Sequence, residues 1–208
     1  MAAKGLIFDL DGVLVDTVPT HFEAWSQMFH EYGYDFDQRI YRDHVDGKLR
    51  QDGARAVMVN HSEAEIVEAS DRKNEYYLER IRAGQFVVFD AAAKYVRQCK
   101  QDGHKIAAAS SSANVQYILE QAGIIDEFDV ILGGHQVTKG KPNPEIFLSA
   151  AHQLGMPVED CIVFEDSESG VRAAHSGGFF CVGVVDASHD ADLSLADVIV
   201  ASVADYKL

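Results

Sequence analysis

The spacing of apolar positions changes twice along the chain. The first apolar run, at 5–9, has the length of a β-strand. From Thr17 to about Gln85 apolar residues recur every three or four positions, which indicates helices and no convincing strand. Beyond Phe86 apolar runs of strand length alternate with helical stretches. The runs lie at 106–109, 130–132, 161–164, 180–185 and 198–200, and the helical stretches near 91–102, 113–122, 144–155 and 168–177.

This alternation predicts an α/β fold. Strands that alternate with helices form a Rossmann-like, doubly wound and largely parallel sheet, with 5–9 as its first strand. The helical segment is then an insertion between the first strand and the others. We expect a core of residues 1–16 and 87–208 and a helical domain of residues 17–86.

Two carboxylates, Asp9 and Asp11, follow the first strand directly. Because side chains alternate along a strand, both can project from the same side where the strand ends. Gly12 lets the backbone turn there. Carboxylates this close repel each other, so the pair needs a cation, a shared proton or strong donors. A lone pair of this kind could also solvate a turn.

Three later polar clusters each follow an apolar run of strand length. They are residues 110–112, residues 139–144 and residues 165–170. In an open parallel sheet, ligands bind outside the carboxyl ends of the strands. We therefore expect hydroxyls, a lysine and a second carboxylate pair to converge on Asp9 and Asp11.

Composition and charge exclude some classes of partner. The 208 residues are 47% hydrophobic and 25% charged, as in ordinary soluble proteins. No apolar run could span a bilayer, and residues 1–5 show no signal-peptide pattern, so we expect a cytoplasmic monomer. The net charge of -15 argues against nucleic acid. Three cysteines without zinc-site spacing predict buried, reduced thiols: Cys99, Cys161 and Cys181.

Taken together, the polar clusters resemble the four signature motifs of the haloacid dehalogenase superfamily, in order and over nearly the full length. Within it the chain is most similar to the beta-phosphoglucomutase-like phosphatases and mutases. The matching residues are 9–17 (DLDGVLVDT), Ser110, Lys141 within 140–145 (GKPNPE), and Glu165-Asp166. Taken singly, the later clusters could be an N-cap, a solvated loop lysine and charge at a helix start. Their order and spacing favour an active site.

The resemblance implies phosphoryl transfer from a small phosphosugar. Asp9 would attack phosphorus and form an aspartyl-phosphate. Asp11 would act as general acid and then general base. Ser110 and Lys141 would hold the transferring oxygens.

The resemblance also implies Mg²⁺ as the cofactor. The carboxylates of Asp9 and Asp166 and the main-chain carbonyl of Asp11 would supply the oxygen ligands that Mg²⁺ prefers. Glu165 would support this shell.

In the resembled family the helical insertion is a cap over the active site. Thr17, His21 and Trp25 can share one face; for His21 and Trp25 the alternative is packing between cap and core. The resemblance suggests further substrate contacts: Arg50, Ser112 and Asn114 at a distal phosphate, and Lys73 with Asn74 as a cap pair facing the active site.

The chain departs from the mutase pattern at two places. Asp46 stands where the mutase motif usually carries a lysine, and residues 89–92 (FDAA) replace the usual Pro-Gly turn. An acidic residue in the substrate loop should repel a second phosphate, although Lys48 could compensate.

Three functions remain open on the sequence. The leading one is a Mg²⁺-dependent sugar phosphatase, and the second is a sugar-phosphate mutase with the same aspartyl-phosphate. The third is a non-catalytic receiver-like switch, which the long helical insertion argues against. Dehalogenase chemistry is disfavoured because dehalogenases usually lack the second carboxylate, which is present here as Asp11.

Overall fold

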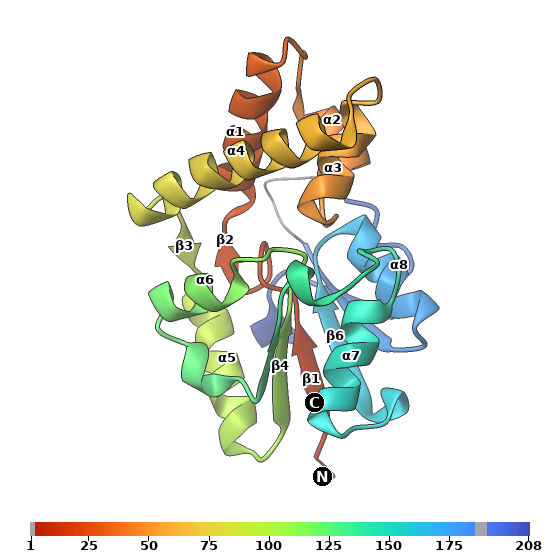
Figure 1. Cartoon of the computed structure of the whole chain (residues 1–208). Coiled ribbons are helices and arrows are strands. Elements are labelled where there is room, and N and C mark those ends of the chain that lie inside the picture. The colour runs from red at the N-terminus through yellow and green to blue at the C-terminus, as the bar shows by residue number, and fades with distance from the viewer. Residues whose placement is uncertain (1–2, 186–190) are drawn as a thin grey trace.

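The computed structural model describes residues 3–185 and 191–208. Residues 1–2 and 186–190 lie outside the described residues. Both belong to the predicted core, and residues 1–2 also belong to the segment 1–5 that shows no signal-peptide pattern. The core is a parallel six-stranded sheet in the order β5-β4-β1-β6-β7-β8, with helices on both faces, and a helical domain lies above the ends of its strands (Figure 1). The predicted doubly wound α/β fold with a helical insertion is confirmed.

The predicted strands and helices of the core are all present. The strands are β1 (Gly5–Phe8), β4 (Lys105–Ala109), β5 (Val130–Leu132), β6 (Cys161–Glu165), β7 (Phe180–Val184) and β8 (Val198–Val200). The helices are α5 (Asp90–Gln101), α6 (Val115–Gln121), α7 (Glu145–Leu154) and α8 (Glu168–Ser176), with 3₁₀ turns at Ile125–Glu127, Gly134–Gln136, Val158–Asp160 and Val203–Asp205.

Alternation along β1 produces the two layers of the core. Leu6 and Phe8 are buried in one apolar cluster with α5 and α6, and Ile7 is buried in the other with α7 and α8. Phe8 stacks on Phe164 of β6 with ring centroids 4.5 Å apart. Because Phe8 is also in register with Phe164, the first polar residues after β1 and near the end of β6 lie side by side.

The helical domain, which we call the cap, has its own apolar centre. Its elements are α1 (Val18–Glu31), α2 (Gln38–Ile40), a π-helical turn (Tyr41–Val45), α3 (Arg50–Val57) and α4 (Glu63–Arg82). Ser62 and Glu65 form a capping box that starts α4. The buried faces of α1 and α4 carry Met28, Phe29 and Ile66 into one cluster.

A short ribbon joins the two domains where the chain passes between them. Strand β2 (Val15–Asp16) pairs antiparallel with β3 (Val87–Val88), and two-residue strands are too short for a periodic pattern to predict. The two places where the chain passes from one domain to the other therefore lie side by side. We propose the division into core (1–16 and 87–208) and cap (17–86) on this basis.

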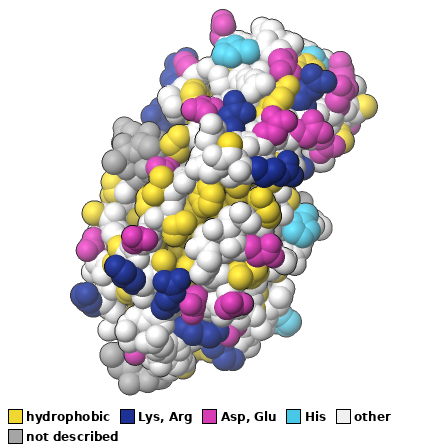
Figure 2. All heavy atoms as spheres, turned by 90° about the vertical axis from the view of Figure 1, so that its left-hand side faces the viewer, with side chains coloured by type: hydrophobic (Ala, Val, Ile, Leu, Met, Phe, Trp, Pro, Cys, Tyr) yellow, Lys and Arg dark blue, Asp and Glu magenta, His cyan; other side chains and the backbone are white. Residues whose placement is uncertain are grey.

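The three thiols are buried as predicted, and one face of the cap carries charges of both signs. Figure 2 shows the face that carries β3, where described Lys and Arg side chains lie among Asp and Glu over the cap and hydrophobic side chains gather below it. Cys99, Cys161 and Cys181 are buried and free. Within the described ranges, no helix is both long and apolar enough to cross a membrane.

Candidate active site

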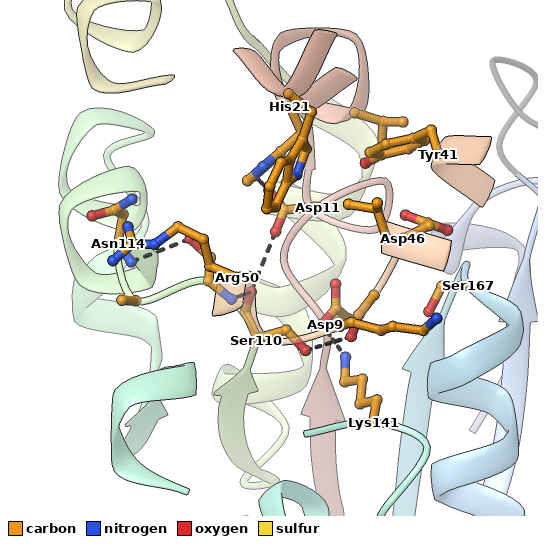
Figure 3. Close-up of a pocket in the computed structure, with 18 of the residues that line it drawn as sticks. Asp9, Asp11, His21, Tyr41, Asp46, Arg50, Ser110, Asn114, Lys141 and Ser167 are labelled. Atoms are coloured by element: carbon orange, nitrogen blue, oxygen red, sulfur yellow. Dashed lines mark hydrogen bonds and ion pairs between the residues drawn. The ribbon is translucent and has the colours of Figure 1, made fainter. Parts of the chain in front are cut away.

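A polar pocket lies between the ends of the core strands and the cap (Figure 3). Core residues that the sequence predicts for the site line it: Asp9, Asp11, Ser110, Ser112, Asn114, Lys141 and Asp166. Cap residues that it predicts line the opposite side: His21, Trp25, Arg50, Lys73 and Asn74. Two predicted residues, Thr17 and Glu165, lie behind the lining and contact residues that form it.

A buried lysine holds two carboxylates at the floor of the pocket. The Lys141 Nζ lies 2.5 Å from Asp9 Oδ1 and also donates to Glu165 Oε1. Asp9 follows β1, Glu165 ends β6, and the N–H of Asp9 donates to the Phe164 carbonyl over 2.9 Å. The second oxygen of Glu165 accepts from the N–H and hydroxyl of Ser167. In these contacts Glu165 orients the lysine.

Burial and charge act against each other in this trio. Burial alone would lower the pKa of Lys141, but the charges of Asp9 and Glu165 outweigh it and raise that pKa well above its usual range. Burial raises the pKa of Asp9, and the Lys141 ammonium opposes the rise. The lysine therefore stays charged and favours the ionised form of Asp9.

Asp11 is held from both domains. Thr17 Oγ1 donates to Asp11 Oδ1, and His21 Nε2 lies 3.3 Å from the same oxygen. From the core, the Ser110 hydroxyl donates to Asp11 Oδ2 over 3.3 Å. Burial acts to raise the pKa of Asp11, but the charge and hydrogen bond of His21 and the hydrogen bond of Thr17 lower it to about 2.

Lys73 continues this chain of contacts into the cap. Its Nζ lies 2.7 Å from His21 Nδ1 and 4.9 Å from the ring centroids of both Trp25 and Tyr77. Burial lowers the pKa of Lys73 to about 7, and burial together with Lys73 lowers the pKa of His21. Trp25 thus packs under the cation within the cap and also lines the pocket.

The proposed Mg²⁺ ligands fit a magnesium site with few protein ligands. Among the described residues, no three His, Cys, Asp or Glu side chains converge as a complete metal cluster. Mg²⁺ usually keeps several waters and takes one or two carboxylates, which Asp9 and Asp166 can supply. Gly12, with a φ of 74°, makes room for the second of these: a Cβ there would lie 1.8 Å from Asp166 Oδ2. The donor set therefore fits the ion.

A cluster of polar side chains from the core and the cap lies on the far side of the pocket. Asn114 Nδ2 donates to Asn74 Oδ1 over 2.8 Å, which joins core to cap, and the Asn114 N–H donates to the Ser112 hydroxyl. Arg50 lies 3.5 Å from Asp71, while its buried Nε has no hydrogen-bond partner in the described part of the chain. The sequence-predicted residues for a distal phosphate are thus brought together.

The side opposite Arg50 is acidic (Figure 3). The N–H of Asp46 donates to the Tyr41 carbonyl over 2.9 Å, and the buried Tyr41 hydroxyl donates to the Asp46 carboxylate. Burial, and then the charge of Asp46, raises the pKa of Tyr41 well above its usual range. The Lys48 ammonium, which could compensate for Asp46, donates to the carbonyls of Asp43 and His44.

Three lining residues lie outside every segment that the sequence predicts for the site. They are Val18, Tyr41 and Ala113. Ala113 directly follows the predicted serine triplet, so its position was a usable signal. Tyr41 gave no such signal, because a π-helical turn has no recognised residue pattern and only the fold brings its ring to Asp46.

Comparison with known proteins assigns the family. Residues 3–178 match a family model described as haloacid dehalogenase-like hydrolase. The chain is 35% identical over 188 residues to the beta-phosphoglucomutase of Bacillus subtilis, covering 87% of this chain and 83% of the relative. It is 34% identical over 197 residues to a phosphorylated carbohydrates phosphatase of Thermotoga maritima, covering 90% and 88%.

A solved structure agrees with this assignment. The crystal structure of a beta-phosphoglucomutase from Clostridium difficile superposes with a TM-score of 0.90 at 30% identity, covering 99% of this chain and 94% of that one. The chain belongs to the haloacid dehalogenase-like hydrolases, within the group that resembles beta-phosphoglucomutase.

Proposed function

We propose that the protein is a Mg²⁺-dependent phosphatase for a small sugar phosphate, which works through a phosphorylated Asp9. The observation that carries the proposal is the buried contact of Asp9 with Lys141 at the floor of a pocket that Asp11 also lines. Curated relatives include a beta-phosphoglucomutase and sugar-phosphate phosphatases. Sugar-phosphate chemistry is therefore the first to test.

Asp9 supplies the nucleophile in this proposal. Its carboxylate oxygen bonds to phosphorus while the bond from phosphorus to the sugar oxygen breaks, so one displacement becomes two easier ones. Lys141 lowers the repulsion between Asp9 and an anionic phosphate, and Ser110 can donate a hydrogen bond to the transferring oxygens. Bound Mg²⁺, held by Asp9, Asp166 and the Asp11 carbonyl, would neutralise phosphate charge.

Asp11 moves the protons of both steps. With a pKa of about 2 it is ionised at neutral pH, as a base that accepts a proton from water must be. As an acid that protonates the leaving sugar oxygen, it must first gain a proton. Lys73, with a pKa lowered to about 7, can hold that proton near neutral pH, and the His21 ring lies between Lys73 and Asp11.

Asp46 favours hydrolysis over mutase chemistry. A mutase must hold a phosphosugar with phosphate at both ends of the pocket. Asp46 lines that pocket, and the Lys48 ammonium is engaged with backbone carbonyls. Like-charge repulsion of on the order of 1 kcal/mol is expected for groups ~4 Å apart in water.

A sugar-phosphate mutase is the second candidate. The buried Arg50 Nε, which has no hydrogen-bond partner among the described residues, lines the pocket with Asn114 and Ser112, and this group could bind a distal phosphate. The receiver-like switch is not proposed, since the family model that matches describes a hydrolase. No binding of nucleic acid, a monomeric state and a cytoplasmic location stay predictions.

A screen of phosphorylated metabolites with Mg²⁺ tests the proposal. Free phosphate and isomerised product should be followed in the same reactions. Release of phosphate from a sugar phosphate supports the proposal, and the absence of both products across sugar phosphates contradicts it.

We predict that Asp9→Asn abolishes turnover without unfolding the protein. The amide keeps the size of the side chain but cannot act as nucleophile, so kcat should fall by at least about 10³-fold. Steady-state kinetics measure the loss and circular dichroism checks the fold. Turnover retained at more than roughly one per cent would exclude Asp9 as the nucleophile.

We predict that EDTA removes activity and that Mg²⁺ restores it, whereas Ca²⁺ restores little. Ca²⁺ prefers longer bonds and more ligands, which would misplace the phosphate. Asp166→Ala should raise the Mg²⁺ concentration for half-maximal activity by at least about tenfold. An unchanged metal requirement in that variant would remove Asp166 from the ligands.

We predict that Lys73→Met changes how stability depends on pH. The unfolded chain keeps a proton on Lys73 up to about pH 10.5, while the folded chain loses it near pH 7. Between these values the unfolded state binds more protons, so the wild-type free energy of unfolding should rise with pH relative to Lys73→Met, by more than about 1 kcal/mol. Urea unfolding from pH 6 to pH 10 measures it, and parallel curves would refute the shift.

We predict that Asp46→Lys shifts product formation towards isomerisation. With beta-glucose 1-phosphate and a trace of the 1,6-bisphosphate, the wild type should release more free phosphate than glucose 6-phosphate. The variant should raise the share of glucose 6-phosphate because it replaces repulsion by attraction. An excess of glucose 6-phosphate of about tenfold in the wild type, ~1.4 kcal/mol of barrier, would instead make the protein a mutase.

A further inference from the structure

Leu49 is an apolar side chain in the polar contact between cap and core. It lies between the π-helical turn and α3 and directly precedes Arg50, in the same loop as Asp46 and Gly47. A Cβ at Gly140 of the core would lie 2.5 Å from Leu49 Cγ, and one at Gly134 would lie 2.7 Å from Leu49 Cδ2. Leu49 therefore fits against the core only because both core residues lack side chains.

Two hydrogen bonds hold the same cap loop on the core. The Ser111 hydroxyl donates to the Gly47 carbonyl over 2.6 Å, and the Ser169 hydroxyl donates to the Asp46 carbonyl over 3.2 Å. Both bonds can be exchanged for bonds to water when the cap lifts. The apolar contact of Leu49 has no such replacement in water, because exposing an apolar side chain to water is unfavourable. We call the place of Leu49 against Gly134 and Gly140 its seat, and this contact favours the docked position of the loop.

The seat also adjoins the catalytic lysine. Gly140 immediately precedes Lys141, whose ammonium contacts Asp9. If Leu49 is displaced and the backbone of Gly140 moves with it, the loop that positions the Lys141 ammonium moves as well.

We propose that Leu49 is a positioning residue, which seats between Gly134 and Gly140 when the cap docks and fixes the substrate loop against the loop of Lys141. Its effect on turnover rests on the proposed function. The contact itself does not.

The chain allows a test by added and removed bulk. The three atoms nearest to a methyl group at Gly140 all belong to Leu49: Cγ at 2.5 Å, Cδ1 at 3.1 Å and N at 3.2 Å. Gly140→Ala therefore disturbs the cap contact in particular, and Leu49→Ala removes the two closest atoms. Gly134 is less suitable, because a methyl group there would also lie 2.1 Å from the Ser111 carbonyl oxygen.

The experiment is a double-mutant cycle of Gly140→Ala and Leu49→Ala, with Leu148→Ala as control for loss of an exposed leucine on α7. Gly140→Ala should lower kcat/KM by about tenfold or more in the wild-type background, partly through kcat, but by less than about twofold in the Leu49→Ala background. Equal losses in both backgrounds, or a loss in KM alone, would overturn the proposal. Leu148→Ala should stay within about twofold of wild type.

Hydrogen exchange separates this proposal from the proposed function. In proteins without ligand, Gly140→Ala should speed exchange of backbone amides in residues 46–49 when Leu49 is present and not when residue 49 is alanine. If Gly140→Ala leaves exchange in residues 46–49 unchanged while Leu49 is present, the proposed contact of Leu49 with Gly140 is wrong. If the wild type hydrolyses no phosphate ester, the proposed function fails while exchange still decides the role of Leu49.

Discussion

The buried ion contacts of Lys141 with Asp9 and Glu165 are the constraint on which the site depends. The register of β1 with β6 places two carboxylates side by side at the sheet edge, where they would repel each other without a cation. Removing one partner of such a buried group typically costs ~3–5 kcal/mol. The lysine therefore keeps both buried carboxylates from lacking a counter-charge, and it opposes the rise that burial causes in the pKa of Asp9.

The second carboxylate of the proposed site depends on the cap. Asp11 belongs to the core, yet Thr17 at the start of α1 and His21 within it lower its pKa, and Lys73 of α4 contacts His21. Docking of the cap therefore does more than cover the pocket, since it also sets the protonation of the proposed acid–base residue. Contacts that hold the cap in place therefore bear on the proposed chemistry.

The sequence was sufficient for the fold because strands and helices rest on local patterns, and the residues that the family resemblance proposes for the site lie together in the structure. Apolar runs marked each core strand within about one residue, and every predicted site residue either lines the pocket or contacts a residue that does. The parts that escaped prediction depend on long-range contacts. They are the β2–β3 ribbon, the hydrogen bond of Tyr41 to Asp46, and the ion pair of Glu165 with Lys141. The resemblance alone would assign Glu165 to the support of the metal ion.

The most direct test of this account is the phosphorylation of Asp9 and its dependence on Lys141. The enzyme is mixed with a turned-over sugar phosphate and Mg²⁺, quenched in acid within one turnover, and mapped by mass spectrometry. The account predicts phosphate on the peptide that carries Asp9 in the wild type, and its loss in folded Lys141→Met. Phosphate on another residue, or phosphorylation at the wild-type rate in Lys141→Met, would contradict it.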